Sequence, residues 1–178
     1  MASAGGGAFY DEKENPTRLV CQPGGTLLGT GTLAYVNSTG SEKMKSLNLL
    51  NCGVIAPGQQ EGKPGTLTLT AADVAFGSEA EKGPLPRGAG ILRIDIAGTP
   101  GQPAKYDTLQ VSGAVTFIKG AANALEVIAP AGFTPSGKYR IVTCQAVNGR
   151  FDVLRCNGKD NVPYAVEYGN DGIDVIFR

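Results

Sequence analysis

The sequence predicts an all-β fold: a solenoid of parallel strands over most of the chain, closed by antiparallel strands at the C-terminal end. Three observations support this prediction. Apolar and β-branched residues alternate with polar residues at period two, the pattern of strands with one buried face. Glycine, proline and asparagine interrupt these runs, and glycine alone accounts for 26 of the 178 residues, about twice the usual share of roughly 7%. Helical periodicity is nearly absent.

The alternating segments recur along the chain without the fixed-length motif of leucine-rich or propeller repeats. In "ILRIDI", for example, Ile91, Ile94 and Ile96 interleave with Arg93 and Asp95, which predicts one buried face and one solvated face. The expected strands lie within Thr26–Val36, Ser46–Ile55, Gly65–Phe76, Gly90–Gly98, Tyr106–Ile118, Asn123–Pro130, Lys138–Val147, Arg150–Cys156, Tyr164–Gly169 and Ile173–Arg178.

Two all-β architectures fit these segments. In a β-sandwich most neighbouring strands are joined by tight hairpins with Asn-Gly or Asp-Gly turns, whereas strands of a parallel solenoid return through irregular loops. Turn signals of the hairpin type gather in the last third of the chain, at Asn148-Gly149, Asn157-Gly158 and Asn170–Gly172. The earlier part uses long Gly/Pro loops such as Gly77–Gly90, so we expect a solenoid there and an antiparallel end.

The chain therefore divides into three predicted parts. Residues 1–25 are expected to be irregular, and "MASAGGG" reads in part as an added leader rather than natural sequence. Residues 26–136 form the solenoid coils, and residues 137–178 form the capping strands. The N-terminus lacks the apolar core of a signal peptide, and no run reaches the ~18 apolar residues of a membrane helix. We expect a piece of a longer protein whose targeting signal lies elsewhere.

Four phrases follow one another in a specific order. They are "GVIAPGQQEGKPGTLTLT" (Gly53–Thr70), "GILRIDIAGTPGQPAKYDTLQVSGAVTF" (Gly90–Phe117), "GFTPSGKYRIVTCQAVNGRFDVL" (Gly132–Leu154) and "YAVEYGNDGIDVIF" (Tyr164–Phe177). Over residues 46–178 this order resembles the C-terminal part of an autotransporter passenger domain and, more broadly, autotransporter-associated β-strand repeat proteins. The family pattern is an Ala-Pro-Gly loop before a Gly-Thr-Leu strand, a Tyr-Asp-Leu-x-Val-x-Gly strand and a Gly-x-Phe hairpin. The four cysteines of this chain depart from it.

The resemblance implies a right-handed parallel β-helix that is extracellular or displayed on a bacterial outer membrane, with last coils that cap the stack and help it fold. Its implied partners are the rest of a longer parent chain and a glycan or host-surface ligand. Ala56-Pro57-Gly58 would then be a solenoid corner, because proline cannot donate to a ladder and glycine accepts a sharp reversal. In the next strand Thr66 and Thr68 face one side, and Leu67 and Leu69 face the other.

The composition argues against catalysis and against charged partners. The chain has no histidine, which removes the commonest general base and the commonest zinc ligand. We expect no catalytic residue, no cofactor and no metal ligand. Lys and Arg number 16 and Asp and Glu number 16, so no net field favours nucleic acid or an anionic membrane. We expect neither nucleic-acid binding nor direct membrane insertion by this segment.

Three classes of function remain. The first is a structural stalk and folding cap of a surface-displayed or secreted bacterial passenger protein, without catalysis. The second is an adhesin module that binds glycans or a host surface through Tyr10, Tyr35, Tyr139 or Tyr168 as stacking platforms.

The third class is a polysaccharide lyase or hydrolase on the same solenoid. It requires carboxylates that converge with a basic side chain, and the candidates for such a cluster are Arg93, Asp95 and Lys105. Exposed charge on a solvated strand face explains these residues more simply, and Tyr106-Asp107 is interpreted as the entry to a strand. We prefer the structural class, because it needs no further assumption.

The alternating pattern also predicts the core and the state of the cysteines. An even number of cysteines in an extracytoplasmic chain suggests disulfides: Cys144 with Cys156, which flank Asn148-Gly149 on strands expected to be neighbours, and Cys21 with Cys52. Buried free thiols are the alternative. The side chains expected to point inward are Leu67, Leu69, Ile91, Ile94, Ile96, Leu109, Val111, Leu125, Val127, Ile141 and Phe151.

Overall fold

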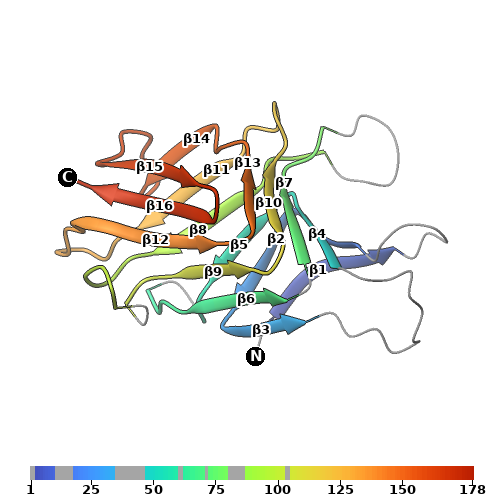
Figure 1. The fold of residues 1–178 in the computed structure, drawn as a ribbon, viewed down its shortest axis with the longest axis horizontal. Helices are drawn as coiled ribbons and strands as arrows, with labels where there is room; N and C mark the ends of the chain where they lie inside the picture. Colours follow the sequence, from blue (N-terminus) through green and yellow to red (C-terminus); the bar gives the residue numbers. More distant parts are fainter. Residues whose placement is uncertain are drawn as a thin grey trace.

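The computed structural model describes residues 3–10, 18–34, 47–59, 62–70, 72–79, 87–102 and 105–178, and within them the protein is all-β, with no α-helix (Figure 1). Side chains are described from Leu19 onward. The strands are β1 (Ser3–Tyr10), β2 (Arg18–Gly29), β3 (Gly31–Ala34), β4 (Leu47–Asn51), β5 (Val54–Pro57), β6 (Thr66–Thr70), β7 (Ala72–Phe76), β8 (Ile91–Asp95), β9 (Thr108–Val111), β10 (Ala114–Phe117), β11 (Ala124–Ile128), β12 (Gly137–Thr143), β13 (Ala146–Asn148), β14 (Val153–Cys156), β15 (Tyr164–Gly169) and β16 (Gly172–Phe177).

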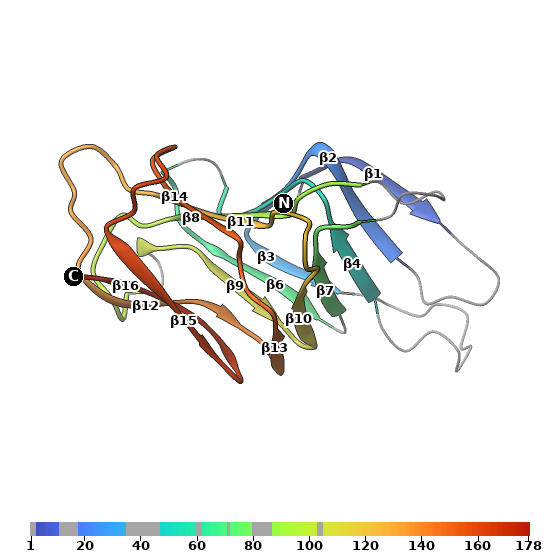
Figure 2. The same cartoon turned by 90° about the horizontal axis from the view of Figure 1, so that it is seen from above.

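Most of these strands belong to a large, curled, mainly parallel sheet, in which the strands from β4 to β11 each pair with the third strand after them. Strand β2 pairs with both β4 and β5. The first ladder runs from the first half of β2 through β4, β7 and β10 to β13. The second ladder runs from the second half of β2 through β5, β8 and β11 to β14. The third ladder, a separate sheet, joins β3, β6, β9 and β12 in parallel. The chain thus visits the three ladders in turn (Figure 2).

The core lies between the ladders and is built from rows of apolar side chains in register. In the second ladder the successive partners Leu27, Ile55, Leu92, Leu125 and Leu154 form one such row. The four residues before Leu154 are buried, at 4% exposure or less. Burying such rows removes apolar surface from water, at about 25 cal/mol per Å², and this is the main term that holds successive strands together.

The expected core is confirmed with one exception. Ten of the eleven residues predicted to point inward are buried, but Ile91 is only half-buried. Leu92 takes the core position instead, and since side chains alternate along a strand, its neighbours Ile91 and Arg93 face outward. The alternation of Thr66 and Thr68 with the buried Leu67 is confirmed in β6.

Each long segment expected as one strand is divided into two, and at some of these divisions the residue at the turn is a glycine. The segment Tyr106–Ile118 becomes β9 and β10, separated by Ser112 and Gly113. A Cβ atom on Gly113 would collide with the carboxylate of Asp73 and the carbonyl oxygen of Ala72. Only glycine fits without a shift of the backbone beside it.

Two buried asparagines satisfy the backbone where the chain passes from the first ladder to the second. Asn51 accepts the Gly53 N–H at 3.1 Å and donates to the Ile91 carbonyl at 3.1 Å. Asn123 accepts the Gly90 N–H at 3.0 Å and also donates, to the Ile118 carbonyl at 2.9 Å. Both side chains are 0% exposed, so these bonds replace the water that the backbone groups have lost.

The C-terminal end is antiparallel, as expected. Strand β16 pairs antiparallel with β12 and with β15, and the β15–β16 turn joins Gly169 to Gly172, which confirms the hairpin expected at Asn170–Gly172. The hairpin expected at Asn148-Gly149 is wrong. There the chain passes from β13 in the first ladder to β14 in the second, and these two strands pair with β10 and β11.

The N-terminal segment expected to be irregular contains two strands. Strand β1 pairs antiparallel with β2, from Tyr10 opposite Arg18 to Ser3 opposite Leu28, with an irregularity between Gly5 and Gly7. It therefore lies along both halves of β2. The glycine-rich sequence of β1 has little strand propensity of its own, so the pairing with β2 overrides the local signal.

Candidate functional site

The loop that follows the Ala-Pro-Gly corner is held by two carboxylates of the next round of strands. Asp107, directly before β9, accepts the Gly65 N–H on Oδ1 at 2.7 Å and the Asp95 N–H on Oδ2 at 2.8 Å. The Asp95 carboxylate, at the end of β8, accepts the Gly62 N–H. Both aspartates are buried, at 1% and 5% exposure. Asp95, expected on a solvated face, is therefore buried and bonded to the backbone at Gly62.

This pair has unusual electrostatics. The pKa of Asp107 is raised to about 8, and burial is the largest cause. The nearby Asp95 also raises this pKa, whereas the two backbone N–H bonds lower it. Two interacting carboxylates, one with a raised pKa, are found in many catalytic sites. Here both oxygens of Asp107 accept backbone N–H groups and the side chain is closed to solvent, so the arrangement anchors a loop rather than meeting a substrate.

The residues predicted for a lyase or hydrolase cluster enter separate contacts. Arg93 donates from Nε to Glu126 Oε2 on the neighbouring strand at 2.9 Å. Asp95 holds the loop at Gly62. Lys105 is exposed, and its stem lies beside Gly98. Tyr106 and Asp107 directly precede β9, as the interpretation of a strand entry requires.

The tyrosines proposed as stacking platforms do not form one in the part that the structure describes. Tyr139 is fully buried and donates its hydroxyl to the Gly98 carbonyl at 2.9 Å. Tyr168 is half-buried, and its hydroxyl oxygen accepts the Phe151 N–H at 3.0 Å. The Tyr10 side chain and Tyr35 lie outside the described residues.

The structure contains no disulfide between the four cysteines, and burial raises the pKa of each thiol, that of Cys52 to about 11. The argument for a bond between Cys144 and Cys156 rested on a hairpin between β13 and β14, which the structure does not have. Cys52 lies next to Cys21, with its N–H donating to the Cys21 carbonyl at 2.8 Å. A bond between these two stays a prediction, which the intact mass of the unreduced protein tests.

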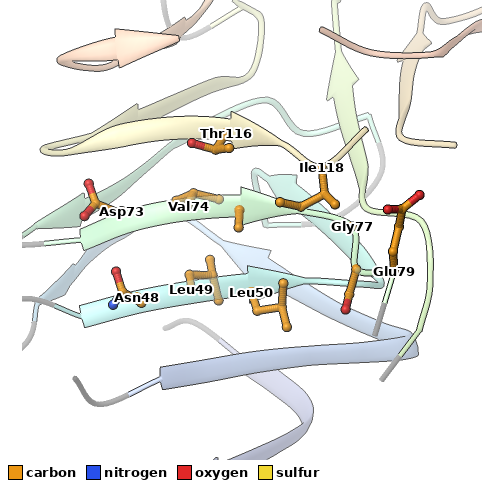
Figure 3. A pocket seen from close by; sticks show the side chains of 11 residues that line it. Asn48, Leu49, Leu50, Asp73, Val74, Gly77, Glu79, Thr116 and Ile118 are labelled. Carbon is orange, nitrogen blue, oxygen red and sulfur yellow. The ribbon is translucent and has the colours of Figure 1, made fainter. Parts of the chain in front are cut away.

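A groove of about 400 Å³ lies on the outer face of the first ladder, over β4, β7 and β10 (Figure 3). Its floor is apolar: Leu50 pairs with Ala75 across β4 and β7, and Ile118 follows β10. Asp73 stands at one end and Glu79 at the other. Sequence reasoning missed this groove, although Leu50 and Ala75 occupy outward positions that a solvated strand gives to polar residues.

Neither a metal centre nor a membrane helix is found in the part of the chain with described placement. No group of three or more Cys, Asp or Glu residues there is arranged to hold a metal ion. Likewise, no helix among the described residues is long and apolar enough to cross a membrane. The fold defines the class, an all-β protein with a large curled parallel sheet. No protein-family model, no curated protein and no solved structure matches the chain.

Proposed function

We propose that the protein is a right-handed parallel β-helix with an antiparallel C-terminal cap, and that it serves as stalk and folding cap of a surface-displayed or secreted bacterial passenger protein. The observation that carries the proposal is that every strand from β3 to β11 pairs in parallel with the third strand after it, in three ladders. Connections between parallel strands of one sheet are right-handed in about 98% of cases, which supports the handedness.

The C-terminal part supports the capping role. The inward side chains of the β15–β16 hairpin lie against the last aromatic residues of the stack. The Tyr168 ring is 6.5 Å from that of Phe151, and the Phe177 ring is 5.9 Å from that of Tyr139. Because a solenoid needs its terminal coil covered to stay soluble, such a hairpin at the end of the third ladder fits a cap.

The proposed location is the extracellular medium or the outer-membrane surface, and the proposed partner is the rest of a longer parent chain. The resemblance in the order of the Ala-Pro-Gly, Tyr-Asp and Gly-x-Phe phrases supports both, and the role requires no catalysis. An adhesin that binds glycans or a host surface and a β-helix lyase or hydrolase remain the alternatives. The burial of Tyr139 does not favour the adhesin, and the ion pair of Arg93 with Glu126 does not favour the enzyme.

The test uses the parent protein in its own cell. An epitope placed in the exposed Asn157–Asp160 turn should be removed by protease from intact cells, and negative-stain images of the parent should show it on an elongated rod. An epitope that is protected in intact cells, or a globular parent, would overturn the proposal. A glycan array with the purified chain distinguishes the adhesin from the stalk, because the adhesin requires specific glycan binding and the stalk does not.

A further inference from the structure

The groove on the first ladder differs from an ordinary solvated strand face. Three outward aliphatic side chains, Leu50, Ala75 and Ile118, line the floor, and Thr116 lies beside Ala75 in the register. Leu50 is 7% exposed, and the other two are half-buried. Such a floor favours an aliphatic chain, because burying it removes apolar surface of both partners from water.

The charges at the two ends of the groove have one sign. Asp73 and Glu79 are both exposed, and neither forms an ion pair with any basic group in the described ranges. Asp73 accepts the Ala114 N–H on Oδ1 at 2.7 Å, which fixes this carboxylate against β10 and leaves Oδ2 for a ligand. Among the residues that the structure describes, no Lys or Arg lines the groove, so an anionic ligand finds no basic partner in this lining.

The lining also distinguishes between neutral and cationic ligands. No aromatic side chain is part of the described lining, so a sugar ring lacks there the flat platform on which it usually stacks. Carboxylates at both ends of an aliphatic floor instead match a molecule with a cation at each end and methylene groups between them. Asp73 and Gly77 are four residues apart along β7, which is about 13 Å of extended chain, and Glu79 lies beyond.

From these observations we propose that the groove binds an extended aliphatic diamine or polyamine, with one ammonium group at Asp73, the other at Glu79, and the chain along Leu50, Ala75 and Ile118. This binding is independent of the stalk function, since it uses only the outer face of the first ladder. Asn48, opposite Asp73 in the register, adds an amide acceptor at the Asp73 end (Figure 3).

The experiment is calorimetric titration of the full chain with spermidine, octamethylenediamine and putrescine, at low ionic strength because exposed ion pairs are screened by salt. Hexylamine and hexanediol are the ligand controls. We expect the two longer amines to bind more tightly than putrescine, and hexylamine and hexanediol to bind least. Glu79→Gln should weaken spermidine binding about two- to fivefold, whereas Asp160→Asn, which removes an exposed carboxylate paired with Arg155 elsewhere, should leave it unchanged.

A second variant separates the groove from general charge attraction. Ala75→Phe fills the floor without changing charge and should abolish spermidine binding, and its melting curve shows whether it is folded. If Ala75→Phe does not fold, Glu79→Gln decides alone, because Glu79 is exposed and outside the strands. The proposal is wrong if no diamine binds, if hexylamine binds as tightly as octamethylenediamine, or if Glu79→Gln or a folded Ala75→Phe binds spermidine like the parent chain.

Discussion

The buried carboxyl of Asp107 should make the stability of this protein depend on pH in an unusual direction. Most paired carboxylates have a lowered pKa in the folded state, and stability then falls in acid. Burial instead raises the pKa of Asp107 from 3.8 to about 8. The folded state therefore holds this proton up to higher pH than the unfolded state does. Its contribution to the free energy of unfolding is full below pH 3.8 and is lost as pH rises towards 8.

The magnitude follows from the same linkage. Each pH unit between the two pKa values costs about 1.4 kcal/mol, so the free energy of unfolding should fall by about 3 kcal/mol between about pH 5.5 and about pH 8. Other side chains contribute little between these two pH values, because the chain has no histidine and the pKa values of the thiols are raised. The two N–H groups that Asp107 accepts favour its charged form, and the pKa of about 8 is what results after they have opposed the effect of burial.

Urea unfolding at several pH values measures this effect, with Asp107→Asn as the control. The variant cannot ionise, so its free energy of unfolding should be nearly flat over the same window. It should also be lower than that of the parent chain at about pH 5.5, because its amide NH₂ faces backbone N–H groups that need an acceptor. A parent chain whose stability is flat or rises from pH 5.5 to pH 8 would refute the raised pKa and the packing that causes it.

Three further predictions concern the stack. Leu92→Ala, in the row at the centre of the second ladder, should cost about 2 to 5 kcal/mol of unfolding free energy in urea titrations, whereas Thr68→Ala on the outer face should change it by no more than about 0.5 kcal/mol. Gly113→Ala should cost about 1 to 3 kcal/mol by crowding the corner; an unchanged melting temperature would contradict the geometry there. Deletion of residues 137–178 should give aggregated protein in size-exclusion chromatography, and a shortened Gly77–Gly90 loop should not; a monomeric deletion that melts like the parent would disprove the capping role.

Local patterns in the sequence were enough to predict the strands after the N-terminal segment, where β1 was missed, but not all of their faces. Period-two alternation gives the side that a residue occupies only when the run is unambiguous, as in "TLTLT". In "ILRIDI" two apolar residues stand together at Ile91 and Leu92, and a shift of one residue exchanges the two faces. The structure selects Leu92, because it is in register with Ile55 and Leu125. This choice depends on strands distant in sequence.

The turn signals show the same limit. Asn157 and Gly158 both have positive φ, at 51° and 74°, and close a tight turn in which Cys156 bridges Lys159. Asn148-Gly149 has the same sequence, and Gly149 also has positive φ, at 87°, but there the turn redirects the chain to another ladder. The glycines are alike, but Asn148 still belongs to β13 and lacks the positive φ of Asn157. The same dipeptide thus adopts two conformations, and the strands available for pairing decide between them.

The candidate sites depend still more on distant parts of the chain. Asp95 is buried and bonded to the backbone at Gly62, in the preceding round of strands, and nothing within "RIDI" distinguishes it from an exposed charge. The groove joins β4, β7 and β10, which parallel pairing brings together from three rounds. A sequence pattern indicates such a site only after the register is known, since Leu50 and Ala75 are neighbours through the ladder and not along the chain.

The two ends of the stack differ from its middle in a way that bears on its function. In the middle, every strand from β4 to β11 has parallel neighbours on both sides within its ladder. A parallel ladder has no internal stop, because its last strand offers the same unpaired edge as each strand before it. Here antiparallel strands interrupt this repetition, β1 along β2 and β16 along β12. On the cap, Lys138 bridges Asp174 at 3.2 Å and Glu167 at 2.8 Å, so the outer strand β15 carries charge at the sheet edge, which disfavours pairing with another chain. At the end of the third ladder the cap thus replaces a parallel edge with a charged antiparallel one, as the proposed capping role requires.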